Sequence, residues 1–136
     1  MARDILHEIV RKVLELDGWI ITHDPYTLKY NPGWAIDLGA EKIVAAEKDN
    51  QKIAVEVKSF REESFANEFH TILGQYLNYR SALKRIDEDR ILFLAVPKSV
   101  YNSEFTIEGI INSVEDYNVR ILVYDFETKK IIKWLN

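Results

Sequence analysis

The chain has 136 residues, of which 47% are hydrophobic and 29% are charged, a composition typical of one globular domain with a single core. The absence of cysteine excludes disulfides and thiolate-bound metals. The formal net charge of −4 at pH 7 argues against a protein that coats nucleic acid non-specifically, although an acidic site can still bind DNA through a metal ion.

We therefore expect a single domain over residues 1–136. No apolar stretch approaches the length needed to cross a bilayer, so no membrane association is expected. The N-terminal residues Met1–Glu8 are charged and amphipathic, unlike a signal peptide, and the expected location is cytoplasmic.

Helical and alternating hydrophobic patterns follow one another along the chain. In order, they predict a helix over 3–17, a strand over 19–23, antiparallel strands over 34–48 and 52–59, a helix over 65–85, a strand over 90–96, a helix over 104–117, and a strand pair over 119–126 and 129–135. The continuous apolar run over 90–96 indicates a strand at the sheet centre. This order predicts an α/β domain (α+β mixed sheet), with helices flanking a central mixed β-sheet.

Two charged residues interrupt the apolar strand over 52–59. Alternation sends Glu56 and Lys58 to the same face of the strand. Burying such charges is costly unless they are paired or hold a metal ion. Asp37 ends another short apolar run and would bring a second carboxylate to the same place. Two carboxylates can bind Mg²⁺ through oxygen, and a lysine beside them can orient a water, which together suit phosphodiester cleavage.

The alternative for Glu56 and Lys58 is an exposed cross-strand pair on the wet face of a hairpin. Gln75 lies on an apolar helix face, where a buried amide needs hydrogen-bond partners that the carboxylates could supply. Tyr79 is one helical turn later, on the same helix face as Gln75. It is either a site residue beside Gln75 or a residue of the hydrophobic core. Glu8 lies next to the apolar stripe of the first helix, where it is either a metal ligand or a solvated surface residue.

The order helix, three-stranded meander, helix and strand resembles the core of the PD-(D/E)xK nuclease superfamily, which has the restriction endonuclease-like fold. Asp37 matches the aspartate of the motif, and Glu56–Lys58 matches its D/E-x-K, whereas Ile36 stands where the name has proline. Glu8 matches the helical glutamate of members such as archaeal Holliday junction resolvases. Gln75–Tyr79 is similar to the Q-x-x-x-Y motif of RecB-type members.

This resemblance implies a set of roles. The implied catalytic residues are Asp37, Glu56, Lys58 and Gln75, and the implied ligands of Mg²⁺ (or Mn²⁺) are Glu8, Asp37, Glu56 and the carbonyl of Val57. The expected substrate is DNA, held mainly through its phosphates. Its candidate contacts are Arg61, Tyr79, Arg80 and Lys84, for which scattered surface charge and, for Tyr79, core packing are the alternatives.

A narrower resemblance is carried by four segments. Residues 36–41, 46–48, 53–60 and 74–76 strongly resemble XisH, the cyanobacterial family of excision controlling factors for the fdxN DNA element. This resemblance implies an endonuclease of the XisH type in DNA excision or recombination, acting beside a small XisI-like companion. The alternatives are a non-catalytic accessory factor that binds DNA or protein, and a structural subunit whose buried charges determine its packing.

The C-terminal third is rich in aromatic residues. Trp134 lies in the last predicted strand, 129–135, which we expect at an edge of the sheet. An edge strand with exposed apolar side chains favours pairing with another chain. We therefore expect a homodimer or a heteromer built partly on residues 119–135.

Overall fold

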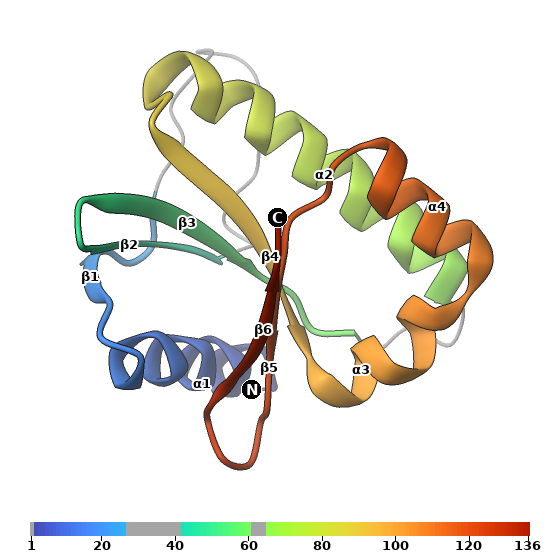
Figure 1. The fold of residues 1–136 in the computed structure, drawn as a ribbon, viewed down its shortest axis with the longest axis horizontal. Helices are drawn as coiled ribbons and strands as arrows, with labels where there is room; N and C mark the ends of the chain where they lie inside the picture. Colours follow the sequence, from blue (N-terminus) through green and yellow to red (C-terminus); the bar gives the residue numbers. More distant parts are fainter. Residues whose placement is uncertain (1, 27–41, 61–64) are drawn as a thin grey trace.

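A computed structural model describes residues 2–26, 42–60 and 65–136. They form a six-stranded mixed sheet flanked by helices (Figure 1), which confirms the predicted fold class. The elements are α1 (Ala2–Leu16), β1 (Ile20–His23), β2 (Lys42–Lys48), β3 (Gln51–Val57), α2 (Phe65–Ile86), β4 (Arg90–Pro97), α3 (Lys98–Ser103), the 3₁₀ turn η1 (Glu104–Thr106), α4 (Glu108–Asp116), β5 (Ile121–Tyr124) and β6 (Ile131–Leu135). No helix in these described parts of the chain is long and apolar enough to span a bilayer.

The strands lie side by side in sequence order, from β1 to β6. β3, β4 and β5 run parallel to one another, and the other neighbours are antiparallel. Parallel neighbours require crossover connections, which α2 supplies between β3 and β4 and the helical segments after β4 supply before β5. β4 therefore lies inside the sheet, as its continuous apolar run predicts, and β6 is an edge strand.

The β2–β3 hairpin turns at Asp49 and Asn50, whose φ angles are 50° and 66°. Two successive positive φ angles are typical of a type I′ turn, and Asp and Asn tolerate this conformation better than most residues. The antiparallel pairing predicted for residues 34–48 and 52–59 is confirmed for the described strands Lys42–Lys48 and Gln51–Val57. Residues 34–41 of the predicted second strand lie outside the described residues.

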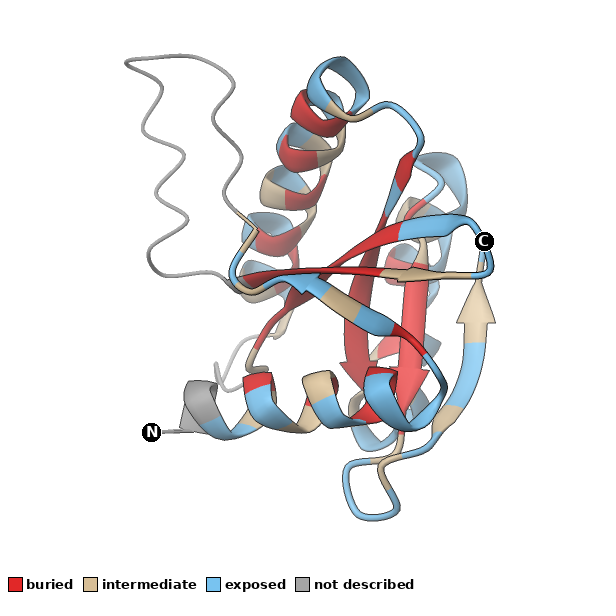
Figure 2. Cartoon of the chain, turned by 90° about the vertical axis from the view of Figure 1, so that its left-hand side faces the viewer, coloured by how far each residue is buried: buried red, intermediate tan, exposed pale blue. Residues whose placement is uncertain are grey.

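The two faces of the sheet carry two separate apolar clusters. Val10, Val13 and Leu14 of α1 pack against one face, which includes Val55 and Val57. Phe69, Ile72 and Tyr76 of α2 pack against the other face, which includes Ala54. Figure 2 shows the buried side of each helix turned towards the sheet. The sheet is thus the middle layer of three.

The predicted helix over 104–117 is wrong in its bounds. The chain already turns helical at Lys98, directly after Pro97, and it breaks at Ile107, where φ is −71° and ψ is 128°. An extended residue cannot continue a helix, so η1 and α4 are separate. α3 has only six residues, which is too short for the apolar periodicity by which a helix is found in a sequence.

Candidate functional site

Glu56 lies in β3 on the face that α2 covers. The Glu56 side chain points to the same face of the sheet as Ala54, because side chains two residues apart in a strand share a face. Its residue neighbours across the sheet are Ile43 in β2 and Leu94 in β4, both of which belong to the α2-side core. Glu56 is 0% exposed, so an acidic side chain lies inside an apolar layer.

Lys58 follows the last residue of β3 and is 6% exposed. Its Nζ lies 3.4 Å from Glu56 Oε2 and donates a hydrogen bond to Gln75 Oε1 from α2. The structure thus brings together three predicted site residues from a strand end and a helix. The alternative of an exposed Glu–Lys pair does not hold, because both side chains are buried.

The chemistry of this trio differs from that of a surface ion pair. A buried pair loses hydration and becomes favourable only when additional hydrogen bonds satisfy its polar atoms. Gln75 supplies one such acceptor to the Lys58 ammonium. The result is a fixed positive group beside a carboxylate at the carboxyl end of β3, an arrangement able to stabilise negative charge on a ligand.

Tyr76 fixes α2 against the sheet next to this trio. Its hydroxyl donates to the Leu92 carbonyl at 2.9 Å and accepts from the Arg120 N–H at 3.0 Å. Burial raises the pKa of Tyr76, so this hydroxyl stays protonated and able to donate. Because Gln75 precedes Tyr76, the same anchoring determines the position of the Gln75 amide.

The remaining predicted residues of α2 lie in different surroundings. Tyr79 is buried in the core rather than on a DNA-facing surface. Arg80 donates to the Asn118 carbonyl at 2.8 Å, and its guanidinium carbon lies 5.4 Å from the centre of the Tyr76 ring. Lys84 is exposed in the last turn of the helix. Of these three, Lys84 alone presents an exposed side chain to a phosphate.

The structure describes only some of the predicted metal ligands. Asp37 and the predicted DNA contact Arg61 lie outside them. Glu8 is exposed on α1, the helix that packs against the opposite face of the sheet from Glu56. Within the part of the chain that the structure describes, no three His, Cys, Asp or Glu side chains form a group that could hold a metal ion.

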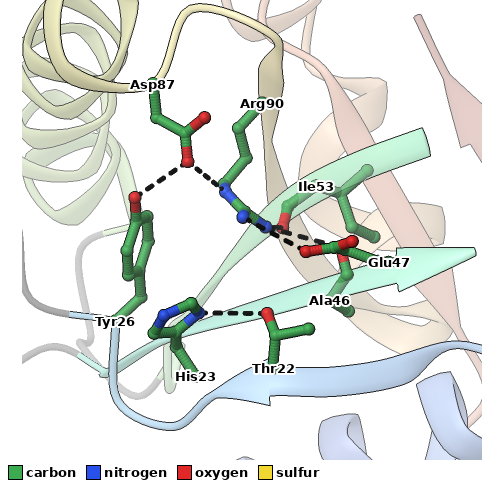
Figure 3. Close-up of polar contacts among 8 residues, drawn as sticks. All are labelled: Thr22, His23, Tyr26, Ala46, Glu47, Ile53, Asp87 and Arg90. Atoms are coloured by element: carbon green, nitrogen blue, oxygen red, sulfur yellow. Dashed lines mark hydrogen bonds and ion pairs between the residues drawn. The ribbon is translucent and has the colours of Figure 1, made fainter. Parts of the chain in front are cut away.

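A second buried charged group, which the sequence analysis missed, lies at the start of β4 (Figure 3). Arg90 donates to the Ile53 carbonyl at 3.0 Å, and its Nε lies 2.7 Å from Asp87 Oδ2. Asp87 also accepts a 2.9 Å hydrogen bond from the Tyr26 hydroxyl. We call Tyr26, Asp87 and Arg90 the Arg90 network. An arginine that opens an apolar strand three residues after an aspartate is the signal that could have revealed it.

The Arg90 network changes the acidity of its members. Burial by itself would raise the pKa of Asp87, but hydrogen bonds from Arg90 and Tyr26, together with the Arg90 charge, outweigh it and hold this pKa below its ordinary value. Burial, reinforced by the hydrogen bond to Asp87, raises the pKa of Tyr26. The tyrosine therefore remains the donor and the aspartate the acceptor.

This lowered pKa makes protein stability depend on pH in acid. The unfolded chain binds the Asp87 proton at about pH 3.9, the ordinary value, whereas the folded chain binds it only at lower pH. The stabilisation that ionised Asp87 gives the folded protein is therefore complete above the unfolded pKa. It is lost as the pH falls from the unfolded pKa towards the lower pKa of the folded protein. In urea unfolding between pH 6 and pH 3, the stability difference between wild type and Asp87→Asn should shrink as the pH falls. The exposed neighbour Asp89, changed to Asn, is the control and should follow wild type at every pH.

A third polar group ties α1 to the segment after β1. His7 is buried, and its Nε2 lies 2.6 Å from Asp24 Oδ1, while Arg11 Nη1 lies 2.6 Å from Asp24 Oδ2. The hydrogen bond with Asp24 raises the pKa of Arg11. His7 and Arg11 are one helical turn apart, a spacing that places both on one face of α1. Asp24 is thereby held against the helix two residues before Tyr26.

Known proteins resemble this chain over nearly its whole length. The family model described as XisH protein matches residues 1–132. The crystal structure of an XisH family protein from Nostoc punctiforme PCC 73102 is 42% identical, with a TM-score of 0.89, and the match covers 98% of this chain and 100% of that one. That of an fdxN element excision controlling factor protein from Anabaena variabilis is 44% identical, with a TM-score of 0.90 and the same coverage. No curated protein matches the chain. Both the family model and the shared fold thus lead to one conclusion: the chain belongs to the XisH family.

Proposed function

We propose that this protein is a metal-dependent DNA endonuclease of the XisH type that acts in DNA element excision or recombination. The observation that carries the proposal is the buried Lys58 ammonium, held between Glu56 and Gln75 at the end of β3. The Anabaena variabilis relative, an fdxN element excision controlling factor protein, supports a DNA element as the setting.

The described donors suit a hard cation. Glu56 and the main-chain carbonyl of Val57 offer oxygen, which Mg²⁺ and Mn²⁺ prefer, and neither thiolate nor a histidine cluster competes for the role. Asp37 would supply the second carboxylate. Glu8 stays a prediction as a further ligand. When bound, the cation would polarise the scissile phosphate and lower the pKa of a bound water.

The residues of the chain carry the remaining chemistry. Lys58 would orient the attacking water and stabilise the negative charge that develops on the phosphate. Gln75 accepts a hydrogen bond from Lys58 and so fixes the direction of the ammonium. Because Lys58 is buried and already bonded to Gln75, this geometry needs little reorganisation when substrate arrives. Lys84, exposed on α2, and Arg61 would contact DNA phosphates.

A second candidate function is a non-catalytic accessory factor that works with an XisI-like partner. The description of the Anabaena variabilis relative as a controlling factor favours it. The partner surface would be β6, an edge strand on which Ile132 is exposed. Trp134, in contrast, is half-buried: the centre of its ring system lies 4.9 Å from that of Phe93 and 5.8 Å from that of Trp19, so it packs against the core on the α1 side of the sheet. A homodimer through the same edge would present two sites to a duplex.

Metal binding should stabilise the folded protein. A ligand at one hundred times its dissociation constant adds about 2.7 kcal/mol to the free energy of unfolding by mass action. We expect MnCl₂ to raise the melting temperature of wild type, and Glu56→Gln to reduce this rise, because one carboxylate ligand is lost. Thermal melts with and without Mn²⁺ measure the rise of each protein against its own melting temperature without metal.

Glu115→Gln is the control for charge, because Glu115 is exposed at the end of α4. Its response to Mn²⁺ should equal that of wild type. A wild-type melting curve that stays unchanged across millimolar Mn²⁺ contradicts the metal site and leaves the accessory factor as the better function.

A further inference from the structure

Lysines follow the carboxyl ends of all three parallel strands. β3, β4 and β5 are neighbours that run in the same direction, so their carboxyl ends lie at one end of the sheet. Lys58 directly follows β3, Lys98 directly follows β4, and the turn after β5 carries Lys129 and Lys130. Neighbouring strands lie about 4.8 Å apart, so β5 lies about 10 Å from β3. The end of the sheet that holds Lys58 therefore continues into a second basic segment.

The turn between β5 and β6 is held by its own hydrogen bonds. The Asp125 N–H donates to the Lys130 carbonyl at 2.9 Å, and the Lys129 N–H donates to the Asp125 carbonyl at 2.9 Å. The Glu127 N–H donates to Asp125 Oδ1 at 3.1 Å, a hydrogen bond that lowers the pKa of Asp125. Lys98 Nζ lies 3.8 Å from Asp125 Oδ2 and so links α3 to the turn. A turn fixed in this way loses little conformational freedom when it binds a ligand.

The same turn presents an aromatic ring beside lysines. Phe126 is 43% exposed, and it is in neither of the two apolar clusters that the described residues form. Lys130 is also exposed, and Figure 2 shows this turn projecting from the body of the domain. Residues 125–133 contain three lysines and two acidic residues, in a chain whose net charge is −4. Positive charge is thus concentrated around an exposed ring.

We propose that the β5–β6 turn, residues 125–130, binds single-stranded DNA, with Lys129 and Lys130 on the phosphates and Phe126 stacked on a base. The role rests on the proposed function, in which DNA is the substrate, but it requires no metal ion. Proteins bind single strands through this combination of phosphate contacts and aromatic stacking. The flat face of a base is open to a side chain only where the base is not stacked within a duplex, so the single strand is the preferred ligand.

Removing the Phe126 ring is the first test. Fluorescence anisotropy of a labelled oligothymidylate in EDTA measures binding without cleavage. For Phe126→Ala we expect affinity for this single strand to fall by about 5- to 150-fold, the range of one base–aromatic stack. Affinity for a duplex of the same length should fall less. Tyr117→Ala is the control, because Tyr117 is an aromatic residue of similar exposure after α4, and it should bind like wild type.

Removing the Lys130 charge is the second test. Each phosphate contact on a single strand contributes about 0.7 to the slope of log affinity against log salt concentration. Lys130→Gln should therefore bind more weakly and show a slope smaller by about this amount. Lys52→Gln is the matched control, because Lys52 is an exposed lysine at the start of β3, the opposite end of the sheet. Its slope should equal that of wild type.

The outcomes separate this role from the proposed function. If Phe126→Ala and Lys130→Gln keep wild-type affinity and slope, the turn does not bind DNA, while cleavage by wild type with Mn²⁺ would still support the endonuclease. If both variants lose affinity although wild type never cleaves, the role stands and the endonuclease fails. If polyglutamate competes as well as oligothymidylate and Phe126→Ala has no effect, the lysines attract any anionic polymer, and the DNA role is wrong.

Discussion

Replacing Lys58 by methionine is expected to reduce the rate of DNA cleavage by about 100-fold or more, the cost of losing one preorganised group that stabilises developing charge. Methionine retains most of the length and apolar volume of lysine, so the space between β3 and α2 stays filled. The lost element is the ammonium beside Glu56. Mn²⁺ binding should persist, because the proposed oxygen ligands are all retained.

Cleavage is measured on linear and supercoiled DNA with Mn²⁺, below the melting temperature of the variant. Binding is measured separately by the electron paramagnetic resonance signal of free Mn²⁺. Lys52→Met is the matched control, because Lys52 is an exposed lysine of β3, the strand that Lys58 directly follows. This variant should cleave DNA at the wild-type rate. Equal cleavage by Lys58→Met and wild type would remove Lys58 from the mechanism. A wild type that never cuts DNA, even with Mn²⁺ and an XisI-like companion, would favour the accessory factor.

Replacing Arg90 by methionine is expected to destabilise the domain by about 3–5 kcal/mol, the cost of removing one partner from a buried ionic group. The change leaves the Asp87 carboxylate without its cation and the Ile53 carbonyl without its 3.0 Å donor. Glu47, whose side chain is 43% exposed and lies 3.8 Å from Arg90, should add little because water can replace the arginine there.

Urea unfolding followed by tryptophan fluorescence measures this loss as a lower midpoint at unchanged slope. Arg85→Met is the matched control: Arg85 is an exposed arginine that donates to the Ser81 carbonyl in its own helix. We expect its stability to stay within about 0.5 kcal/mol of wild type. A comparably small loss in Arg90→Met would mean that hydration, rather than Arg90, satisfies Asp87 and the Ile53 carbonyl.

Local patterns in the sequence were sufficient for much of the fold. The alternation of residues 52–59 places Glu56 and Lys58 on one face whatever the surroundings, because the side-chain period of a strand is two. The polar residues 49–51 between two strand patterns indicate a hairpin turn, and it forms at Asp49 and Asn50, which accept positive φ more readily than most residues. The apolar run from Arg90 to Val96 predicts an interior strand. Each of these depends on neighbours in sequence.

Other features depend on contacts between distant residues, and only the tertiary structure decided them. Alternation shows that Glu56 and Lys58 share a face, but the packing of α2 makes that face a buried one and brings Gln75 to Lys58 across 17 positions. The Arg90 network joins Tyr26 to Asp87 across 61 positions. The break at Ile107 separates η1 from α4, and the burial of Phe105 next to it contributes to the core. Hydrophobic periodicity reports which side of an element is buried but not what covers it, so the partners of a buried charge emerge only when the layers pack together.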